Sequence, residues 1–401
     1  MEWIYSHAFQ QSLPAKRIIG EVGDPTQGPA LLFFGGIHGN ELSGLFALQQ
    51  VFKQLESQAI SFNGYAVGIT GNLAAIRKTK RFEDEDLNRI WTKEKIEQLN
   101  SPTYQPISEE EKEQKEIYEV IQEVLQNNPG PFYFFDLHTT SSDTIPFITV
   151  NDNLLNRSFT QHYPVPIILG IEEYLEGPLL SYINRLGYVA FGYEGGQHTS
   201  EIALDNHIAF IYLSIILTGS ITNKEFFSST YYQHLLKQTA SFAGFYEITH
   251  RHALLPTDLF QMQEGFVNFE RIRKNTPLAL HNQRKVTAPK SGYLFMPLYQ
   301  PQGEDGFFVI QKINPFFLRL SAKLRKWKLD QWIVQLPGIE WDQKDPETLI
   351  VHQKTAHFLT KKIFHLLGYR RRKVNQNTLH IHNREKRARY GDYEGASWLN
   401  I

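Results

Sequence analysis

Two short segments carry residue types that can bind a metal ion. The segment GGIHGNE at residues 35–41 places His38 and Glu41 three residues apart, and DLH at residues 136–138 follows roughly a hundred residues later. Each segment comes at the end of an apolar run that predicts a buried strand. Two imidazoles and one carboxylate are a three-ligand set for a catalytic zinc, which leaves its fourth position open for water. We therefore expect one Zn²⁺ per chain, bound by His38, Glu41 and His138.

A second glutamate ends another predicted strand. The spacing His-x-x-Glu is weak evidence alone in a chain with 15 histidines, because a histidine at a helix entry beside an exposed glutamate also explains it. Glu194, in GYEGG at residues 192–196, adds a third strand end with a metal-type side chain. Open α/β sheets bind ligands outside the carboxyl ends of their strands. We expect Glu194 to act as general base, while a fourth metal ligand and a structural salt bridge remain open alternatives.

Asp136 precedes His138 by two residues, so both side chains point to the same side of an extended strand. In that position Asp136 can accept a hydrogen bond from a metal-binding imidazole and orient it. A buried carboxylate bonded to backbone or to the hydroxyl groups of residues 139–142 is the alternative.

The segment RKTKRFEDEDLNR at residues 77–89 combines a dense charge pattern with an Asn-Arg pair. Arginine binds carboxylates with two parallel hydrogen bonds, and asparagine adds a neutral donor. Composition alone favours a solvated surface loop. Leu87, Ile90 and Trp91 bracket Asn88 and Arg89 and indicate a packed segment instead.

The composition describes a globular protein with no strong bias. The chain has 401 residues, 41% of them hydrophobic, a net charge of −1 and no cysteine. We therefore expect no disulfides and no attraction to nucleic acid. The N-terminus lacks the pattern of a signal peptide, and the longest apolar run, 208–217, is too short for a membrane span. We expect a cytoplasmic protein, and a homo-oligomer is possible.

Apolar runs alternate with helical patterns over the first 220 residues. Strands are predicted at 30–34, 65–70, 132–135, 165–169 and 188–193, and helices follow Asn40, a candidate N-cap, and Ser108, which forms a capping box with Glu111. This alternation predicts an α/β fold with a mixed, mostly parallel sheet and helices on both faces. We expect a catalytic domain over residues 1–242.

The pattern changes after about residue 242 to short strand-like pieces and turns. We expect a smaller β-rich domain over 243–345, then a helix at about 346–367 within a C-terminal region of 346–401. Residues 369–390 hold eight lysines and arginines against one glutamate. This basic tail could bind nucleic acid or anionic lipid, but its interspersed apolar residues favour a packed surface segment.

In this order, the motifs GGxHGNE, DLNR, DLH and EGG resemble the succinylglutamate desuccinylase/aspartoacylase family, which has a zinc carboxypeptidase-like fold. The resemblance implies zinc at His38, Glu41 and His138 and a general base at Glu194. It further implies that Arg81 polarises the scissile carbonyl and that the pair 88–89 holds a substrate carboxylate. The implied reaction is zinc-dependent hydrolysis of the non-peptide amide bond of a small, carboxylate-bearing N-acyl amino acid.

The chain departs from the family pattern at a second carboxylate-binding position. Aspartoacylases have an arginine ten residues before the general base, where this chain has Asn184, so neighbouring Arg185 is our candidate substrate-binding residue. Two other functions stay open: a zinc carboxypeptidase acting on peptide C-termini, and a zinc-binding protein without catalysis. A C-terminal β domain that caps the site would favour small acyl amino acids over peptides.

Overall fold

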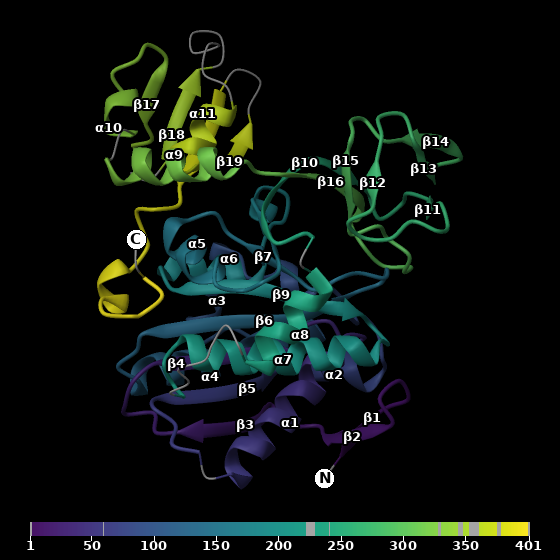
Figure 1. Ribbon diagram of the computed structural model, residues 1–401, viewed down its shortest axis with the longest axis vertical. Helices are drawn as coiled ribbons and strands as arrows, with labels where there is room; N and C mark the ends of the chain where they lie inside the picture. Colours follow the sequence, from purple (N-terminus) through teal and green to yellow (C-terminus); the bar gives the residue numbers. More distant parts are fainter. Residues whose placement is uncertain are drawn as a thin grey trace.

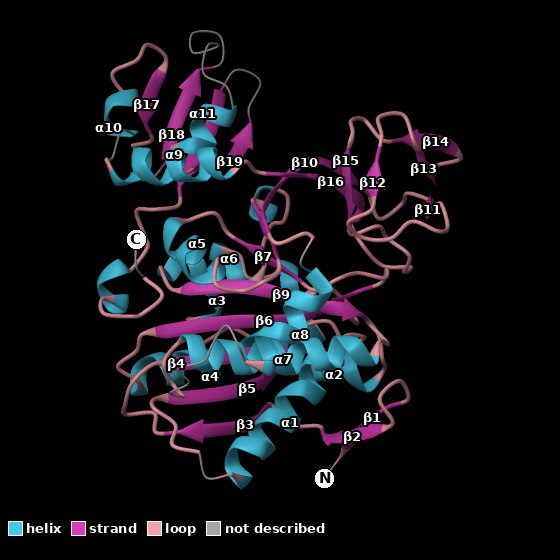
Figure 2. Ribbon diagram, viewed as in Figure 1, coloured by secondary structure: helices cyan, strands magenta, loops and turns pink. Residues whose placement is uncertain are grey.

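The computed structural model describes residues 2–58, 60–221, 229–239, 241–327, 330–343, 348–352, 361–374 and 378–399. Figures 1 and 2 show a body built around one long sheet, with two smaller lobes beside one end of it. One lobe holds β11 to β15, and the other holds α9 to α11 and the last strands.

The central sheet has eleven strands and is mostly parallel through the body. β5, β4, β6 and β9 are successive parallel neighbours, and β3 and β7 are antiparallel to β5 and β9. The predicted α/β fold class is therefore confirmed. In spatial order the strands are β12 (Arg271–Ile272), β15 (Gly292–Phe295), β16 (Asp305–Lys312), β10 (Gly244–Ala253), β8 (Pro166–Leu169), β7 (Phe147–Val150), β9 (Val189–Gln197), β6 (Phe132–Thr140), β4 (Ala30–Gly35), β5 (Tyr65–Thr70) and β3 (Ile18–Gly23).

Both faces of the sheet are covered because its strands are apolar on both sides. Leu31 and Phe33 belong to the core under α1 (Ser43–Ser57) and α7 (Glu201–Leu217). Leu32 and Phe34 belong to the core under α4 (Glu109–Asn127) and α6 (Leu179–Leu186). This two-sided burial is typical of parallel sheets, and it explains why the strands read as continuous apolar runs.

The helix starts were predicted with mixed success. Ser108 caps α4 as expected, since its Oγ accepts a hydrogen bond from the Glu111 amide. The Asn40 prediction was wrong: α1 begins at Ser43, and the Asn40 side chain instead donates to Gln300 at 3.2 Å. The remaining helices and strands of the body are β1 (Trp3–Ser6), β2 (Gln11–Pro14), α2 (Leu73–Arg77), η1 (Leu87–Arg89), α3 (Lys93–Leu99), α5 (Leu154–Thr160), η2 (Ile171–Glu173) and α8 (Thr230–Thr239).

Strand β10 carries the central sheet beyond the body. It pairs in parallel with β8 at its start and antiparallel with β16 along its length. A separate three-stranded sheet of β11 (Phe260–Met262), β13 (Pro277–His281) and β14 (Arg284–Thr287) completes this lobe. The sheet therefore crosses residue 242, and the domain boundaries at 242 and 345 stay predictions.

The C-terminal lobe corrects two expectations. The single helix expected at about 346–367 is wrong, because 348–352 form strand β18 (Thr348–His352). Within the described residues, helix α11 covers Lys361–Leu366. The basic segment is not a tail, since it forms β19 (Tyr369–Val374) and β20 (Thr378–Asn383) of a four-stranded sheet. The lobe also contains α9 (Pro315–Lys326), α10 (Asp330–Ile333) and β17 (Ile339–Trp341). After the sheet, η4 (Tyr390–Tyr393) returns to the body, where Tyr393 belongs to the core (Figure 1).

Two basic side chains near the end of the chain pack on aromatic rings. The Lys386 ammonium lies 3.8 Å from the Trp341 ring centre, and the Arg389 guanidinium lies 4.7 Å from that of Tyr188. The packed surface segment was therefore the better prediction for these two residues. The side chains of 370–373 lie outside the described residues. No helix in the described ranges is long and apolar enough to cross a membrane.

A buried ion cluster fastens this lobe to the body, and we call it the Arg325 cluster (Asp152, Arg157, Arg325 and Glu385). Arg325 of α9 contacts Asp152 at 3.1 Å and Glu385 at 2.7 Å, and Asp152 also pairs with Arg157 at 2.6 Å. Arg325 donates in addition to the backbone carbonyl of His365. Asp152 and Arg325 are almost completely buried, so each charge needs the partners that it has here.

Candidate active site

Two adjacent parallel strands of the body lead to the predicted metal ligands, and a third carries the predicted general base. His38 and Glu41 lie in the loop between β4 and α1, and His138 lies near the end of β6. Glu194 of β9 is the register partner of His138 on the neighbouring strand. The four side chains are buried, so the sheet brings the predicted residues together at one edge.

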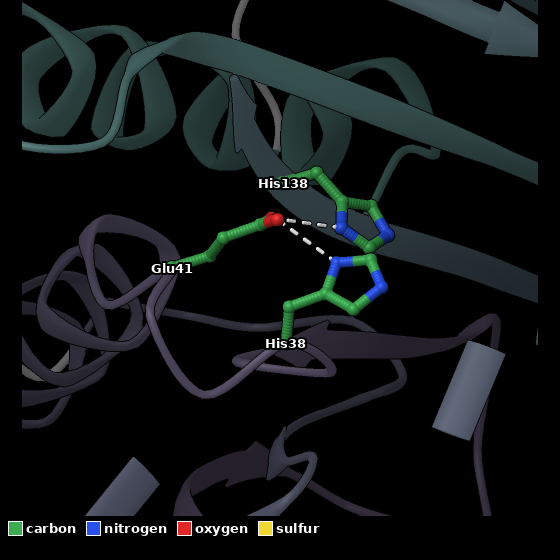
Figure 3. Close-up of side chains that lie close together, drawn as sticks. All are labelled: His38, Glu41 and His138. Atoms are coloured by element: carbon green, nitrogen blue, oxygen red, sulfur yellow. Dashed lines mark hydrogen bonds and ion pairs between the residues drawn. The ribbon is translucent and has the colours of Figure 1, made fainter. Parts of the chain in front are cut away.

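Figure 3 shows the two imidazoles facing the same carboxylate. Nδ1 of His38 lies 2.8 Å from Oε1 of Glu41, and Nδ1 of His138 lies 3.0 Å from Oε2 of Glu41. The three residues each offer one ligand atom within 4.8 Å of the others, and in the described part of the chain they form the one group of this kind. The site could hold a metal ion.

The outer nitrogen of each imidazole contacts a second carboxylate. Nε2 of His38 lies 3.2 Å from Oδ1 of Asp86, and Nε2 of His138 lies 2.7 Å from Oδ2 of Asp136. Such carboxylates fix the orientation of a metal-binding histidine and increase its basicity. The position predicted for Asp136 is confirmed, whereas Asp86 is a contact that we did not foresee from its motif.

The charges of this centre depend strongly on one another. Burial raises the pKa of Glu41, but the two imidazoles outweigh burial and hold its pKa well below the usual range. Burial lowers the pKa of His138, but Asp136 and Glu41 outweigh it and keep its pKa well above normal. Without a metal, a proton on His138 balances part of the negative charge. A bound cation would replace that proton.

One carboxylate oxygen of Glu194, Oε2, is buried and has no hydrogen-bond partner among the described residues. Burial and the nearby acids Glu41 and Asp136 raise its pKa to about 8, although His138 and Arg81 oppose that shift. A buried carboxylate without a partner is costly, and such groups gather at functional sites.

Arg81 reaches the same centre from the loop that follows α2. Its guanidinium lies 3.5 Å from Glu41 and 3.2 Å from Asp86, while its Nε is buried without a partner. The backbone fixes this loop against the metal-ligand loop, since the Gly39 amide donates to the Arg81 carbonyl at 3.1 Å. A Cβ atom on Gly39 would lie 2.3 Å from backbone of Ala75, so only glycine allows this approach.

One pocket is lined by Asn88 and Arg89 together with His38, Glu41, Arg81, His138 and Glu194. The Asn88 Oδ1 accepts a hydrogen bond from the Leu179 amide at 2.9 Å, which fixes its side chain. A further wall comes from residues 296–305, which comprise the loop between β15 and β16 and the first residue of β16. There, Glu304 contacts Arg89 at 3.2 Å. The segment 77–89 therefore belongs to the pocket and is not only a solvated loop.

The comparisons with known proteins agree with this geometry. Residues 27–200 match the family model described as the succinylglutamate desuccinylase/aspartoacylase catalytic domain. The matched segment is less than half of the 401 residues. The match contains the metal-type cluster, the Asn-Arg pair and Glu194, and it confirms the resemblance found in the four motifs.

Individual relatives of the family match over shorter stretches. The chain is 30% identical over 109 residues to a probable aspartoacylase of Nostoc sp., covering 27% of this chain and 34% of that protein. It is 36% identical over 89 residues to an aspartoacylase of Xenopus tropicalis, covering 22% of this chain and 26% of that protein. The chain thus spans about a third or less of the length of these two relatives.

Solved structures of the family share the fold. A succinylglutamate desuccinylase/aspartoacylase structure from Rhodobacter sphaeroides matches with a TM-score of 0.55 and 16% identity, covering 73% of this chain and 88% of that one. A succinylglutamate desuccinylase structure from Vibrio parahaemolyticus matches with a TM-score of 0.52 and 15% identity, covering 73% and 84%.

The structure does not build a second carboxylate-binding site at Asn184 and Arg185. Asn184 is occupied by other partners in the body, among them Asn156 at 2.7 Å and the carbonyl of Leu180. Arg185 donates to the Trp91 carbonyl at 2.8 Å and is absent from the described lining of the pocket. The structure therefore does not bring Arg185 to the other predicted site residues.

Sequence reasoning missed the polar contacts that hold the wall to the metal-ligand loop. Gln300 accepts from Asn40 and contacts Nε2 of His198 at 3.3 Å, and His198 Nδ1 lies 2.8 Å from the Thr139 hydroxyl. These contacts join residues separated by up to 260 positions. Asp86 could have been found, because it opens the DLNR motif, but nothing in the sequence near Gln300 indicates its place.

Proposed function

We propose that this protein is a zinc-dependent amidohydrolase that cleaves the amide bond of a small N-acyl amino acid. The observation that carries the proposal is the convergence of His38, Glu41 and His138 beside Glu194. The Oε2 atom of Glu194 has no hydrogen-bond partner among the described residues. The match of residues 27–200 to a family named for deacylases supports the same reaction.

The donor set fits zinc. Two imidazole nitrogens and one carboxylate are a known ligand set of catalytic zinc sites, and Asp86 and Asp136 stand behind the two histidines. Zinc held by these residues supplies a Lewis acid that makes water a better nucleophile near neutral pH.

The protein groups around the pocket then have separate tasks. Glu194 accepts the proton of the attacking water and delivers it to the leaving amine. Arg81 stabilises the negative charge that develops on the carbonyl oxygen, since its guanidinium already lies beside Glu41. Asn88 and Arg89 hold the substrate carboxylate and fix the position of the amide. The products are a carboxylic acid and a free amino acid.

The wall formed by residues 296–305 favours small substrates over peptides. This loop lines the same pocket as Asn88 and Arg89, and Gln300 ties it to Asn40. An open groove would be expected for an enzyme that takes the end of a long peptide. The carboxypeptidase alternative is therefore the weaker proposal.

Metal analysis followed by a hydrolysis screen tests the proposal. The purified protein should contain about one zinc per chain and should release an amino acid from at least one N-acyl amino acid, with short peptides cleaved more slowly. His38→Ala should lose both metal and activity. Full zinc occupancy in that variant, or no hydrolysis by the zinc-loaded protein across the screen, would contradict the proposal.

A further inference from the structure

We propose that the pocket selects an N-acyl amino acid whose side chain is positively charged, and that Glu304 is the residue that selects it. This inference rests on the proposed function, because it takes Asn88 and Arg89 as the site of the substrate carboxylate. It goes beyond that function by naming the class of amino acid.

Permanent positive charge is scarce in the pocket. Among the described residues that line it, Arg81 and Arg89 carry a guanidinium, and none is a lysine. Arg81 is held by Glu41 and Asp86. Arg89 is therefore left for one substrate carboxylate. A substrate with a second carboxylate needs another cationic partner, and the described lining does not offer one.

The neighbouring arginines are committed elsewhere. Arg185, next to the position where aspartoacylases have their second arginine, donates to the Trp91 carbonyl. Arg251 of β10 is ion-paired with Asp305 and is not among the described lining residues. An anionic side chain on the substrate would thus meet no free guanidinium in this part of the molecule.

The wall formed by residues 296–305 instead carries negative charge. Glu304 and Asp305 both line the pocket, and Oε2 of Glu304 lies 3.2 Å from Nε of Arg89. The Glu304 side chain is 58% exposed, so it is free to move away from this contact. When a substrate carboxylate takes its place on Arg89, Glu304 remains next to the bound amino acid without its partner.

A released carboxylate at this position discriminates by charge. It repels an anionic side chain of the substrate and attracts an ammonium group. Asp305 adds little to this effect while Arg251 balances its charge, so we assign the selection to Glu304. The exchange needs no change at the metal ligands or at Glu194.

Binding measurements on the zinc-loaded protein test the assignment. The probes are Nα-acetylornithine, N-acetylglutamine and N-acetylglutamate, which have side chains of similar length and opposite or no charge, and the readout is Kd by calorimetry. We expect the cationic probe to bind at least tenfold more tightly than the anionic one. Equal or tighter binding of N-acetylglutamate would overturn the proposal.

Two variants locate the effect. Glu304→Gln should reduce the difference between the two charged probes to about threefold or less, whereas Glu264→Gln, an exposed residue of the same lobe, should leave it unchanged. If the Kd values of the cationic and anionic probes differ as much in Glu304→Gln as in wild type, the assignment to this residue is overturned.

Hydrolysis measured in the same samples separates this inference from the proposed function. Charge-selective binding without any hydrolysis would contradict the hydrolase and leave the selection in place. Hydrolysis with preference for N-acetylglutamate would contradict the selection and leave the hydrolase in place. Neither binding nor hydrolysis of any probe would contradict both.

Discussion

In the described part of this protein, two groups of buried charged side chains balance their charges in different ways. In the Arg325 cluster, Asp152 meets two guanidinium groups and Glu385 meets one. At the candidate active site, Glu41, Glu194, Asp86 and Asp136 surround two imidazoles and Arg81. There, one carboxylate oxygen of Glu194 has no partner. The first arrangement suits a structural joint, and the second leaves groups available for a ligand.

The comparison predicts the largest effect for the unpartnered carboxylate. Glu194→Gln should lower kcat on the order of 10³-fold, because the loss of a general base typically costs 10²- to 10⁴-fold. Zinc content should be unchanged, since Glu194 is not in the proposed ligand set. Steady-state kinetics and metal analysis measure the two quantities. Glu201→Gln, an exposed site in the first turn of α7, is the control. Activity within tenfold of wild type would exclude Glu194 as the base.

The Arg325 cluster should respond in stability instead of activity. Arg325→Met leaves Asp152 and Glu385 buried with less positive charge, and breaking such a pair costs about 3 kcal/mol or more. Urea unfolding monitored by circular dichroism measures the loss. Arg319→Met, at an exposed position of the same helix, should change the free energy of unfolding by less than about 0.5 kcal/mol. Equal unfolding midpoints for the two variants would show that the cluster does not stabilise the fold.

The unpartnered carboxylate also predicts a pH dependence of stability in the metal-free protein. Burial raises the pKa of Glu194 to about 8 from 4.5, so between these values the folded chain holds a proton that the unfolded chain has released. The free energy of unfolding contributed by Glu194 therefore falls as pH rises.

Glu194→Gln removes this titration, so its stability relative to wild type should increase by about 3 to 4 kcal/mol between pH 5 and pH 8. Urea unfolding of both proteins after chelation, at the two pH values, gives this difference. A difference that stays constant with pH would show that the carboxylate is ionised in the folded state.

The smallest effect is expected for the arginine outside the pocket. Arg185→Ala should change kcat/KM by less than about threefold, because this side chain donates to the Trp91 carbonyl and does not line the site. Arg89→Ala should raise KM tenfold or more, as expected for the loss of a charged hydrogen bond to substrate. A larger loss in Arg185→Ala than in Arg89→Ala would reverse the placement of the carboxylate.

Sequence reasoning located the centre of the site but not its wall. His38, Glu41, His138 and Glu194 follow apolar runs, and parallel strands bring their ends to one edge, so local patterns sufficed. Gln300 and Glu304 reach the site through contacts between distant segments, which leave no local signal. Arg185 was predicted to bind substrate because it follows Asn184 in the sequence. Adjacent residues on a helix point in different directions, however, so Arg185 does not take the place of Asn184.

The error in the C-terminal lobe has a similar origin. Leu349 and Val351 are buried on either side of the less buried Ile350 in β18, a strand of only five residues. Short alternating segments are stabilised as strands by their neighbours, here β17 and β20.

The contact made by Gly39 has a consequence for how mutations accumulate in this protein. A side chain at this position would strike the backbone around residue 75 and separate two loops at once. One of those loops carries His38 and Glu41, and the other carries Arg81. Position 39 performs no chemistry, yet in a saturation-mutagenesis experiment it should tolerate as little variation as the ligands themselves. A distantly related sequence that keeps both loops should therefore keep a glycine at position 39 as consistently as it keeps a histidine at position 38.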